Sequence, residues 1–204
     1  MSRARTVIRM SPSTREHLGA VLDDLARLFD GIDERQRHDP TPCTDYDVAQ
    51  LRGHVLGWLT TFTAGFADPQ GRAPRADLSD YTAPADPAAA VRAAADQLDA
   101  ALRAGAAERP LSLGEAAMPG EVALSMILWE YQVHGWDLAS ATGQAWDPPG
   151  VEETLEFAPE MLSDDYQGEG KTFGPRLPVP PDAPALDRLL GLSGRDPHWK
   201  PPTG

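Results

Sequence analysis

The residues best suited to chemistry are a carboxylate and an imidazole four positions apart, Glu130 and His134. In a helix this spacing puts both side chains on one face, with about 6 Å between their Cβ atoms. Side chains so placed can converge on one metal ion, as two histidines do in i, i+4 zinc motifs. The same face carries Ala123, Met126 and Ile127, so the pair is predicted to point inward, where an unpaired carboxylate is costly.

His54 offers a third ligand from a second predicted helix. It follows Leu51 by three residues and precedes Trp58 by four, so it lies on the apolar side of that helix. Two histidines and one glutamate from facing helices would form a metal site of the kind that helical bundles build between their helices. Three protein ligands leave one coordination position open, as in catalytic rather than structural zinc sites.

Other interpretations of these residues stay open at this level. With thirty-one acidic residues and five histidines, the spacing of Glu130 and His134 can arise by chance. The two could then form a hydrogen bond in the core, or an exposed pair that contributes little. Asp137, three residues after His134, is expected either to orient that ligand from behind or to bond Trp136 or a nearby backbone group.

The single cysteine, Cys43, excludes an intramolecular disulfide and a cysteine-rich zinc site. It precedes His54 by eleven residues, roughly 16 Å along a helix, so it is expected to be a buried structural thiol and not a ligand. Any thiol chemistry would then use a thiol from outside the chain.

Four amphipathic helices are predicted to position these residues. Apolar residues recur at three- and four-residue spacing in four segments that are separated by polar or proline-containing loops. The segments cover approximately 14–32, 45–67, 87–105 and 120–143. Four helices of similar length joined by modest loops predict an all-α fold, a four-helix bundle, and no alternating strand pattern of useful length stands beside them.

The remaining residues predict an extra helix over 151–162 and then an irregular C-terminal arm, 163–204. Eleven of the twenty prolines lie from Pro148 onward, and only a short helix over 185–192 is expected in the arm. Residues such as Phe173, Leu177 and Trp199 are too apolar for a free tail, so the arm should pack on the bundle. We therefore expect one domain over 1–204, with the bundle in 13–162.

Composition excludes several classes of function. Eighteen basic against thirty-one acidic residues give a formal charge of −13, which disfavours binding to nucleic acid or to an anionic membrane surface. The longest apolar run is too short to span a bilayer, and the first ten residues do not resemble a signal peptide. The expected location is the cytoplasm, as a monomer or homodimer.

Two motifs resemble those of the mycothiol-dependent maleylpyruvate isomerase N-terminal domain family, which belongs to the DinB-like superfamily of metal-binding four-helix bundles. The first is Thr-Pro-Cys-Thr-Asp-Tyr-Asp-Val at 41–48, followed by Leu51 and His54. The second is Glu-Tyr-Gln-Val-His-Gly-Trp-Asp-Leu-Ala at 130–139, running into Ala-Thr-Gly at 141–143. The resemblance covers about 13–162, and the arm is similar to an actinobacterial branch described only as metal-binding.

The resemblance implies that His54, Glu130 and His134 bind a divalent metal ion, usually zinc. It also implies that the thiol is mycothiol and that the reaction is S-transfer, or cis–trans isomerisation by reversible thiol addition to an electrophilic substrate. Tyr46 stands where the family usually has Trp. The isomerase has a second domain that helps bind its substrate, where this chain has the short arm, so maleylpyruvate is not expected as substrate.

Two other functions compete with the thiol enzyme. In one, the protein is not catalytic, and the metal anchors a small ligand or stabilises the bundle. An open, partly apolar cleft with Arg or Asn donors beside the ion would favour the enzyme, and an ion sealed under Trp199 or Phe173 would favour a structural metal. Hydrolysis by a metal-activated water ranks last, because Asp137 is the one evident residue that could act as its general base.

Overall fold

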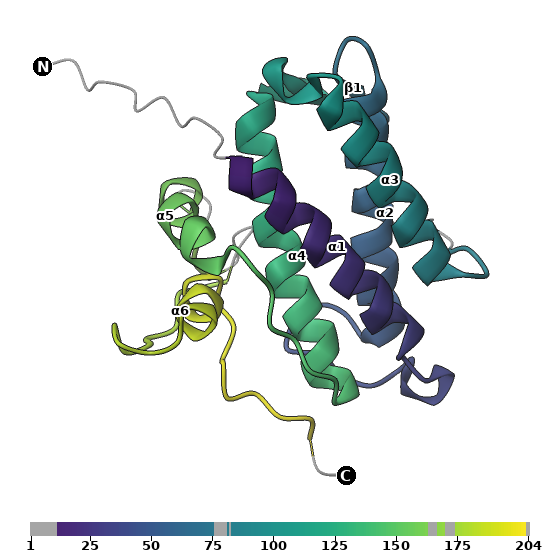
Figure 1. Cartoon of the computed structure of the whole chain (residues 1–204). Helices are drawn as coiled ribbons and strands as arrows, with labels where there is room; N and C mark the ends of the chain where they lie inside the picture. Colours follow the sequence, from purple (N-terminus) through teal and green to yellow (C-terminus); the bar gives the residue numbers. More distant parts are fainter. Residues whose placement is uncertain (1–11, 76–80, 82, 163–166, 170–173, 203–204) are drawn as a thin grey trace, which may run out of the picture.

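A computed structural model of the chain describes residues 12–75, 81, 83–162, 167–169 and 174–202 (Figure 1). Six α-helices, short 3₁₀ turns and three very short strands make up the regular structure of these ranges. In chain order the elements are α1 (Pro12–Asp30), η1 (Glu34–Gln36), α2 (Val48–Ala67), β1 (Arg72–Ala73), α3 (Pro87–Arg103), η3 (Ala106–Glu108), β2 (Leu111–Leu113), β3 (Ala116–Met118), α4 (Gly120–Thr142), α5 (Val151–Met161) and α6 (Ala185–Leu192).

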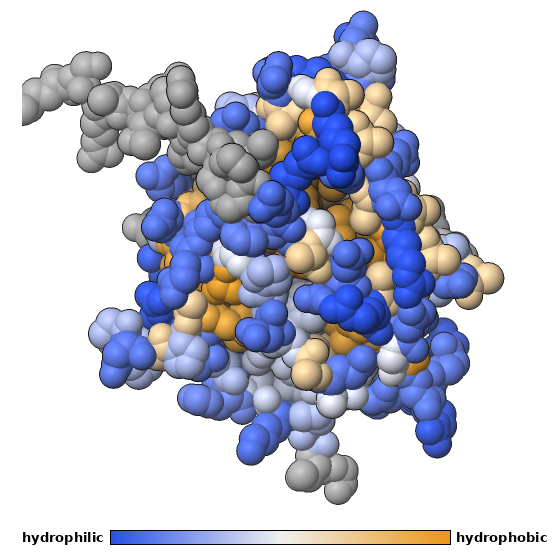
Figure 2. Space-filling view, viewed as in Figure 1, coloured by the Kyte–Doolittle hydropathy of each residue, from blue (hydrophilic) through white to orange (hydrophobic). Residues whose placement is uncertain are grey.

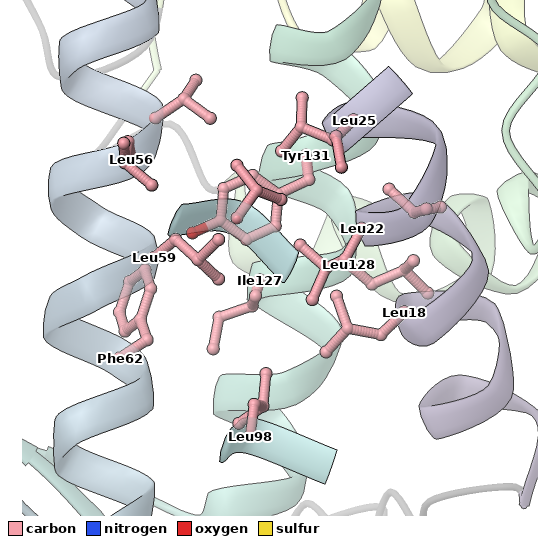
Figure 3. Close-up of a cluster of buried hydrophobic side chains, with 14 of the residues drawn as sticks. Leu18, Leu22, Leu25, Leu56, Leu59, Phe62, Leu98, Ile127, Leu128 and Tyr131 are labelled. Carbon is pink, nitrogen blue, oxygen red and sulfur yellow. The ribbon is translucent and has the colours of Figure 1, made fainter. Parts of the chain in front are cut away.

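Helices α1 to α4 form a four-helix bundle, as the periodicity predicts. Helices α1 and α2 each pack against both α3 and α4. Figure 3 shows the apolar side chains of all four helices pointing toward one another between the ribbons. This core includes Leu18, Leu22, Leu25, Leu56, Leu59, Phe62, Leu98, Ile127, Leu128 and Tyr131. The face seen in Figure 2 is mostly hydrophilic, with hydrophobic residues in patches between.

Local side-chain contacts set the start of the second helix. The Asp47 carboxylate accepts a hydrogen bond from the backbone N–H of Gln50 at 2.8 Å, and the side-chain Oε1 of Gln50 accepts one from the backbone N–H of Asp47 at 2.9 Å. This reciprocal capping box is worth about 1 kcal/mol and starts α2 at Val48. The predicted start at 45 was therefore three residues early. The third helix begins as predicted, with Asp86 capping it and Pro87 in its first turn.

A small three-stranded sheet lies at one end of the bundle and was not predicted. Strand β1 pairs in parallel with β2, and β2 pairs antiparallel with β3. With two or three residues each, the strands are too short for alternation to be visible in the sequence.

Helices α5 and α6 lie beside α4, on the outside of the bundle (Figure 1). They share a second apolar cluster with α4, which contains Trp129 and Val133 of α4 together with Leu189 and Leu190 of α6. From the arm, Trp199 packs on the main core, whereas Leu177 is exposed and Phe173 lies outside the described residues.

Two mid-helix glycines offer a matched test of this packing. A Cβ at Gly135 of α4 would overlap the indole of Trp146, whereas a Cβ at Gly53 of α2 would meet no atom within 4 Å. Gly135→Ala should destabilise the protein by about 1–3 kcal/mol through overpacking. Gly53→Ala should stabilise it by up to about 1 kcal/mol, because alanine is the better helix former. Urea denaturation of both variants measures the difference, and equal stabilities would contradict the close approach of Trp146 to α4.

Candidate metal centre

The three predicted ligands meet between α2 and α4. His54 Nε2 lies 3.5 Å from Glu130 Oε1, and His134 Nε2 lies 3.2 Å from the same oxygen. One ligand atom from each of the three residues lies within 4.8 Å of the others. The imidazole rings of His54 and His134 are edge to face, with centroids 5.3 Å apart. The structure therefore brings together two residues of one helix with a histidine that lies 76 positions before Glu130 in the chain.

The electrostatics of the three side chains are strongly coupled. Burial alone would raise the pKa of Glu130, but the two imidazoles, His134 foremost, hold it well below its usual range. Burial would likewise lower the pKa of His134, but the Glu130 charge and hydrogen bonds to Asp137 and Glu130 raise it to about 9. A half-buried carboxylate kept ionised beside two imidazoles is an arrangement that a cation would complete.

Asp137 holds His134 from behind. Its Oδ2 lies 2.9 Å from His134 Nδ1, and its side chain is 0% exposed. Of the two roles that the sequence left open for Asp137, this contact is the one that orients the imidazole, since it leaves Nε2 directed at Glu130.

Arg195 is the other partner of Asp137 and was missed by the sequence analysis. Its Nη2 lies 3.2 Å from Asp137 Oδ2, and its Nε lies 3.4 Å from both carboxylate oxygens. Arg195 comes from the C-terminal arm, 58 positions after Asp137, so no local spacing could have pointed to it.

Cys43 lies nearer the centre than predicted. It is buried, as expected, but its Sγ, a His134 ring nitrogen and an Asp137 oxygen lie within 4.8 Å of one another. The helical spacing assumed between Cys43 and His54 does not apply over its whole length, because α2 begins only at Val48. The loop before it turns back on itself, with Thr41 Oγ1 donating to the carbonyls of Cys43 and Tyr46.

The group of Cys43, His134 and Asp137 is the weaker of the two candidate cation sites found among the described residues. It would use Asp137, whose oxygens already meet the positive charge of Arg195. The same guanidinium opposes the effect of burial on Cys43, but burial prevails and raises the pKa of the thiol to about 11. A neutral thiol is a poor metal ligand, so the donors fit an ion better at His54, Glu130 and His134.

Beside His54 lies a pocket of about 560 Å³. Tyr46 packs on the His54 ring with centroids 4.9 Å apart, and the Trp58 ring is edge to face with His54 at a centroid distance of 6.5 Å. The pocket is lined by Arg37, His38, Asp45, Tyr46, Asp47, Ala49, Gln50, Gly53, His54 and Tyr81. Of the three candidate ligands, His54 lines this pocket, and the Glu130 side chain is 25% exposed.

The fold and these donors define a class, a helical bundle with a candidate metal centre between facing helices. The chain belongs to the mycothiol maleylpyruvate isomerase N-terminal domain family, whose model matches residues 18–139. That range contains His54, Glu130, His134 and Asp137 but not Arg195.

Two relatives come from Mycobacterium tuberculosis, Uncharacterized protein MT0763 of strain CDC 1551 / Oshkosh and Uncharacterized protein Rv0738 of strain ATCC 25618 / H37Rv. Each is 33% identical over 175 residues, which cover 85% of this chain and 92% of the relative. No solved structure matches the chain significantly. Among the described residues, no helix is long and apolar enough to cross a membrane.

The environment of Cys43 predicts that its thiol reacts slowly with disulfide reagents. Because Cys43 is buried and its pKa is about 11, the folded protein should react with Ellman's reagent far more slowly than the unfolded chain at pH 8. The rate should keep rising between pH 9 and 10.5, where an ordinary thiol levels off. Stopped-flow absorbance with and without denaturant measures this, and equal rates in the two states would contradict the burial of the thiol.

Proposed function

We propose that His54, Glu130 and His134 bind one divalent metal ion, and that the ion activates the thiol of a small cosubstrate for attack on an electrophile. The observation that carries the proposal is the convergence of two imidazole nitrogens on one oxygen of a largely buried carboxylate, at the edge of a pocket. Membership of a family named for a mycothiol-dependent isomerase supports the thiol, and mycothiol is the cosubstrate we propose.

Zinc is the ion that we propose for this donor set. Two imidazoles and one carboxylate are the ligands of several catalytic zinc sites, and three ligands leave a position for an exogenous group. The hydrogen bond from His134 Nδ1 to Asp137 fixes the tautomer in which Nε2 is the ligand. Glu130 lies between the two histidines and would supply the negative charge that partly neutralises the ion.

The charges and the cysteine both support an external thiol. With a divalent ion beside Glu130, Asp137 and Arg195, the centre would carry excess positive charge, which a thiolate would neutralise. Cys43 is unsuited to act as the nucleophile, because its thiol is buried and its pKa is raised. Small thiols stay reduced in the cytoplasm, which is the compartment that this proposal implies.

The proposed chemistry balances without an oxidant or reductant. When bound, a metal held by these residues would lower the pKa of the thiol, so that the thiol would lose its proton to solvent. In isomerisation, the thiolate sulfur would bond to one carbon of an activated double bond, and the π electrons would move onto the activating electron-withdrawing group. The resulting single bond could then rotate, and return of these electrons would re-form the double bond and expel the thiolate. In transfer, the thiolate displaces a leaving group from the electrophile. His54, Glu130 and His134 hold the site, Asp137 orients His134, and the pocket beside His54 binds the body of a substrate.

The pocket separates this proposal from its competitors. It is open and partly aromatic, and Arg37 and Gln50 offer donors at its wall, which favours a bound small molecule over a purely structural ion. In the described part of the chain, Trp199 packs on the main core and is not among the residues of this pocket wall. Hydrolysis is disfavoured because Asp137 is already bonded to His134 and Arg195 and is closed to solvent.

The metal assignment predicts a loss of bound ion in two variants. His54→Ala and His134→Ala should each reduce bound divalent metal from about one per chain to near zero after dialysis, because two protein ligands hold the ion too weakly. His198→Ala, which changes an exposed histidine of the arm, is the matched control and should keep the metal. Inductively coupled plasma mass spectrometry measures occupancy. Full metal content in both ligand variants would refute the assignment.

The thiol assignment predicts a metal-dependent transfer activity. The zinc-loaded protein should accelerate conjugation or isomerisation of an activated electrophile by mycothiol, and a chelator should abolish the acceleration. Liquid chromatography of the thioether product, or absorbance of the isomer, measures the rate. Metal binding without acceleration across a broad panel of electrophiles would leave a non-catalytic metal-dependent binding protein as the better description.

A further inference from the structure

A turn at Gly194, after α6, places the side chain of the arm residue Arg195 beside Asp137. Gly194 has φ +77°, a conformation that glycine adopts without strain, and its amide donates to the Gly191 carbonyl at 3.2 Å. The Arg195 amide donates to the Leu190 carbonyl at 2.8 Å. These bonds end α6 and aim the Arg195 side chain at Asp137.

The same helix end is anchored to α4. Trp129 Nε1 donates to Ser193 Oγ at 2.9 Å, and Ser193 Oγ donates to the Leu189 carbonyl at 2.7 Å. Leu189 and Leu190 are buried in the apolar cluster that contains Trp129 and Val133. Trp129 and Val133 directly precede Glu130 and His134, so the arm docks on the helix that presents two of the three proposed ligands.

The charge of Asp137 links docking of the arm to the position of His134. A fully buried carboxylate needs ionic or hydrogen-bonding partners, and removing one partner from a buried pair is strongly destabilising. Asp137 has His134 on one side and Arg195, itself 15% exposed at its side chain, on the other. Arg195 Nη1 is fixed in turn by the Ser193 carbonyl at 3.1 Å. The position of the His134 ring thus depends on a carboxylate that an arm residue holds.

We propose that Arg195 is a positioning residue through which docking of the arm and occupancy of the metal centre are coupled. The inference rests on the proposed metal site but not on catalysis. Because coupling between two events is reciprocal, a bound ion should tighten the docking of the arm, and a loosened arm should weaken binding of the ion. The opposing effect is that the charge of Arg195 repels a nearby cation, which would make its removal favourable for binding. The sign of the change in zinc affinity when Arg195 is replaced therefore tells the positioning effect of Arg195 from the repulsion by its charge.

The test measures zinc affinity by competition with a chromophoric chelator, and amide exchange over 185–199 by mass spectrometry, with and without zinc. Arg195→Met should weaken zinc binding by about 10-fold or more, the usual size for loss of a group that orients a metal ligand. It should also speed exchange of the arm and remove the protection that zinc confers on it. Arg195→Lys keeps the charge without the planar fork and should fall between Arg195→Met and wild type.

Two further variants sharpen the result. Arg188→Met removes an arginine of α6 that pairs with Glu152 at the surface, and it should behave as wild type in both measurements. Ser193→Ala removes the anchor to Trp129 without touching the Asp137 carboxylate, and it remains informative if Arg195→Met does not fold. It should speed arm exchange and weaken zinc binding together.

Each outcome decides the proposal. Tighter zinc binding by Arg195→Met, or faster arm exchange in Ser193→Ala with unchanged zinc affinity, would overturn the coupling while leaving the metal site intact. Failure of the wild type to bind zinc would overturn both. Thiol transfer is measured in neither experiment, so loss of the enzyme proposal alone would leave the coupling standing.

Discussion

The buried carboxylate of Asp137 is the constraint on which the rest of the centre depends. It lies in the C-terminal part of α4 with no exposure to solvent, where a lone charge would cost several kcal/mol. Its two partners come from different parts of the chain, His134 from the same helix and Arg195 from the arm. Since His134 is held at Nδ1, its Nε2 faces Glu130, and Glu130 in turn faces His54. A single line of contacts thus runs from the arm to α2.

The bundle accommodates these polar groups by keeping them apart from its apolar core. The large apolar residues of α1 to α4 fill the space between the helices (Figure 3), whereas His54 lies in the second turn of α2, beside the loop that precedes the helix. There the interior meets the pocket lined by Tyr46 and Tyr81. The three proposed ligands are therefore buried enough for their charges to interact strongly, while the Glu130 side chain keeps 25% of its exposure.

Membership of the family and the two mycobacterial relatives fit this picture of the centre, and the arm adds to it. The family match ends at residue 139, before the arm, yet the arm residue Arg195 reaches the carboxylate behind His134. The arm thus covers apolar surface of the bundle and also supplies a charged partner for Asp137. Cys43 also lies against this carboxylate and His134, where burial keeps its thiol protonated and leaves the proposed thiol chemistry to an external molecule.

The amino-acid sequence by itself determined the four helices, several of their ends, and the facing of Glu130 and His134 on one side of a helix. These features follow from local spacing, from capping residues such as Asp86, and from glycines such as Gly143, all of which act within a few residues. The three-stranded sheet escaped because its strands are too short to show a period. Only the tertiary structure decided that Arg195 pairs with Asp137 and that Cys43 lies beside His134. Those contacts join residues far apart in the chain. They form because the charge of Asp137 becomes buried only when the helices and the arm pack together, and a buried charge needs a partner.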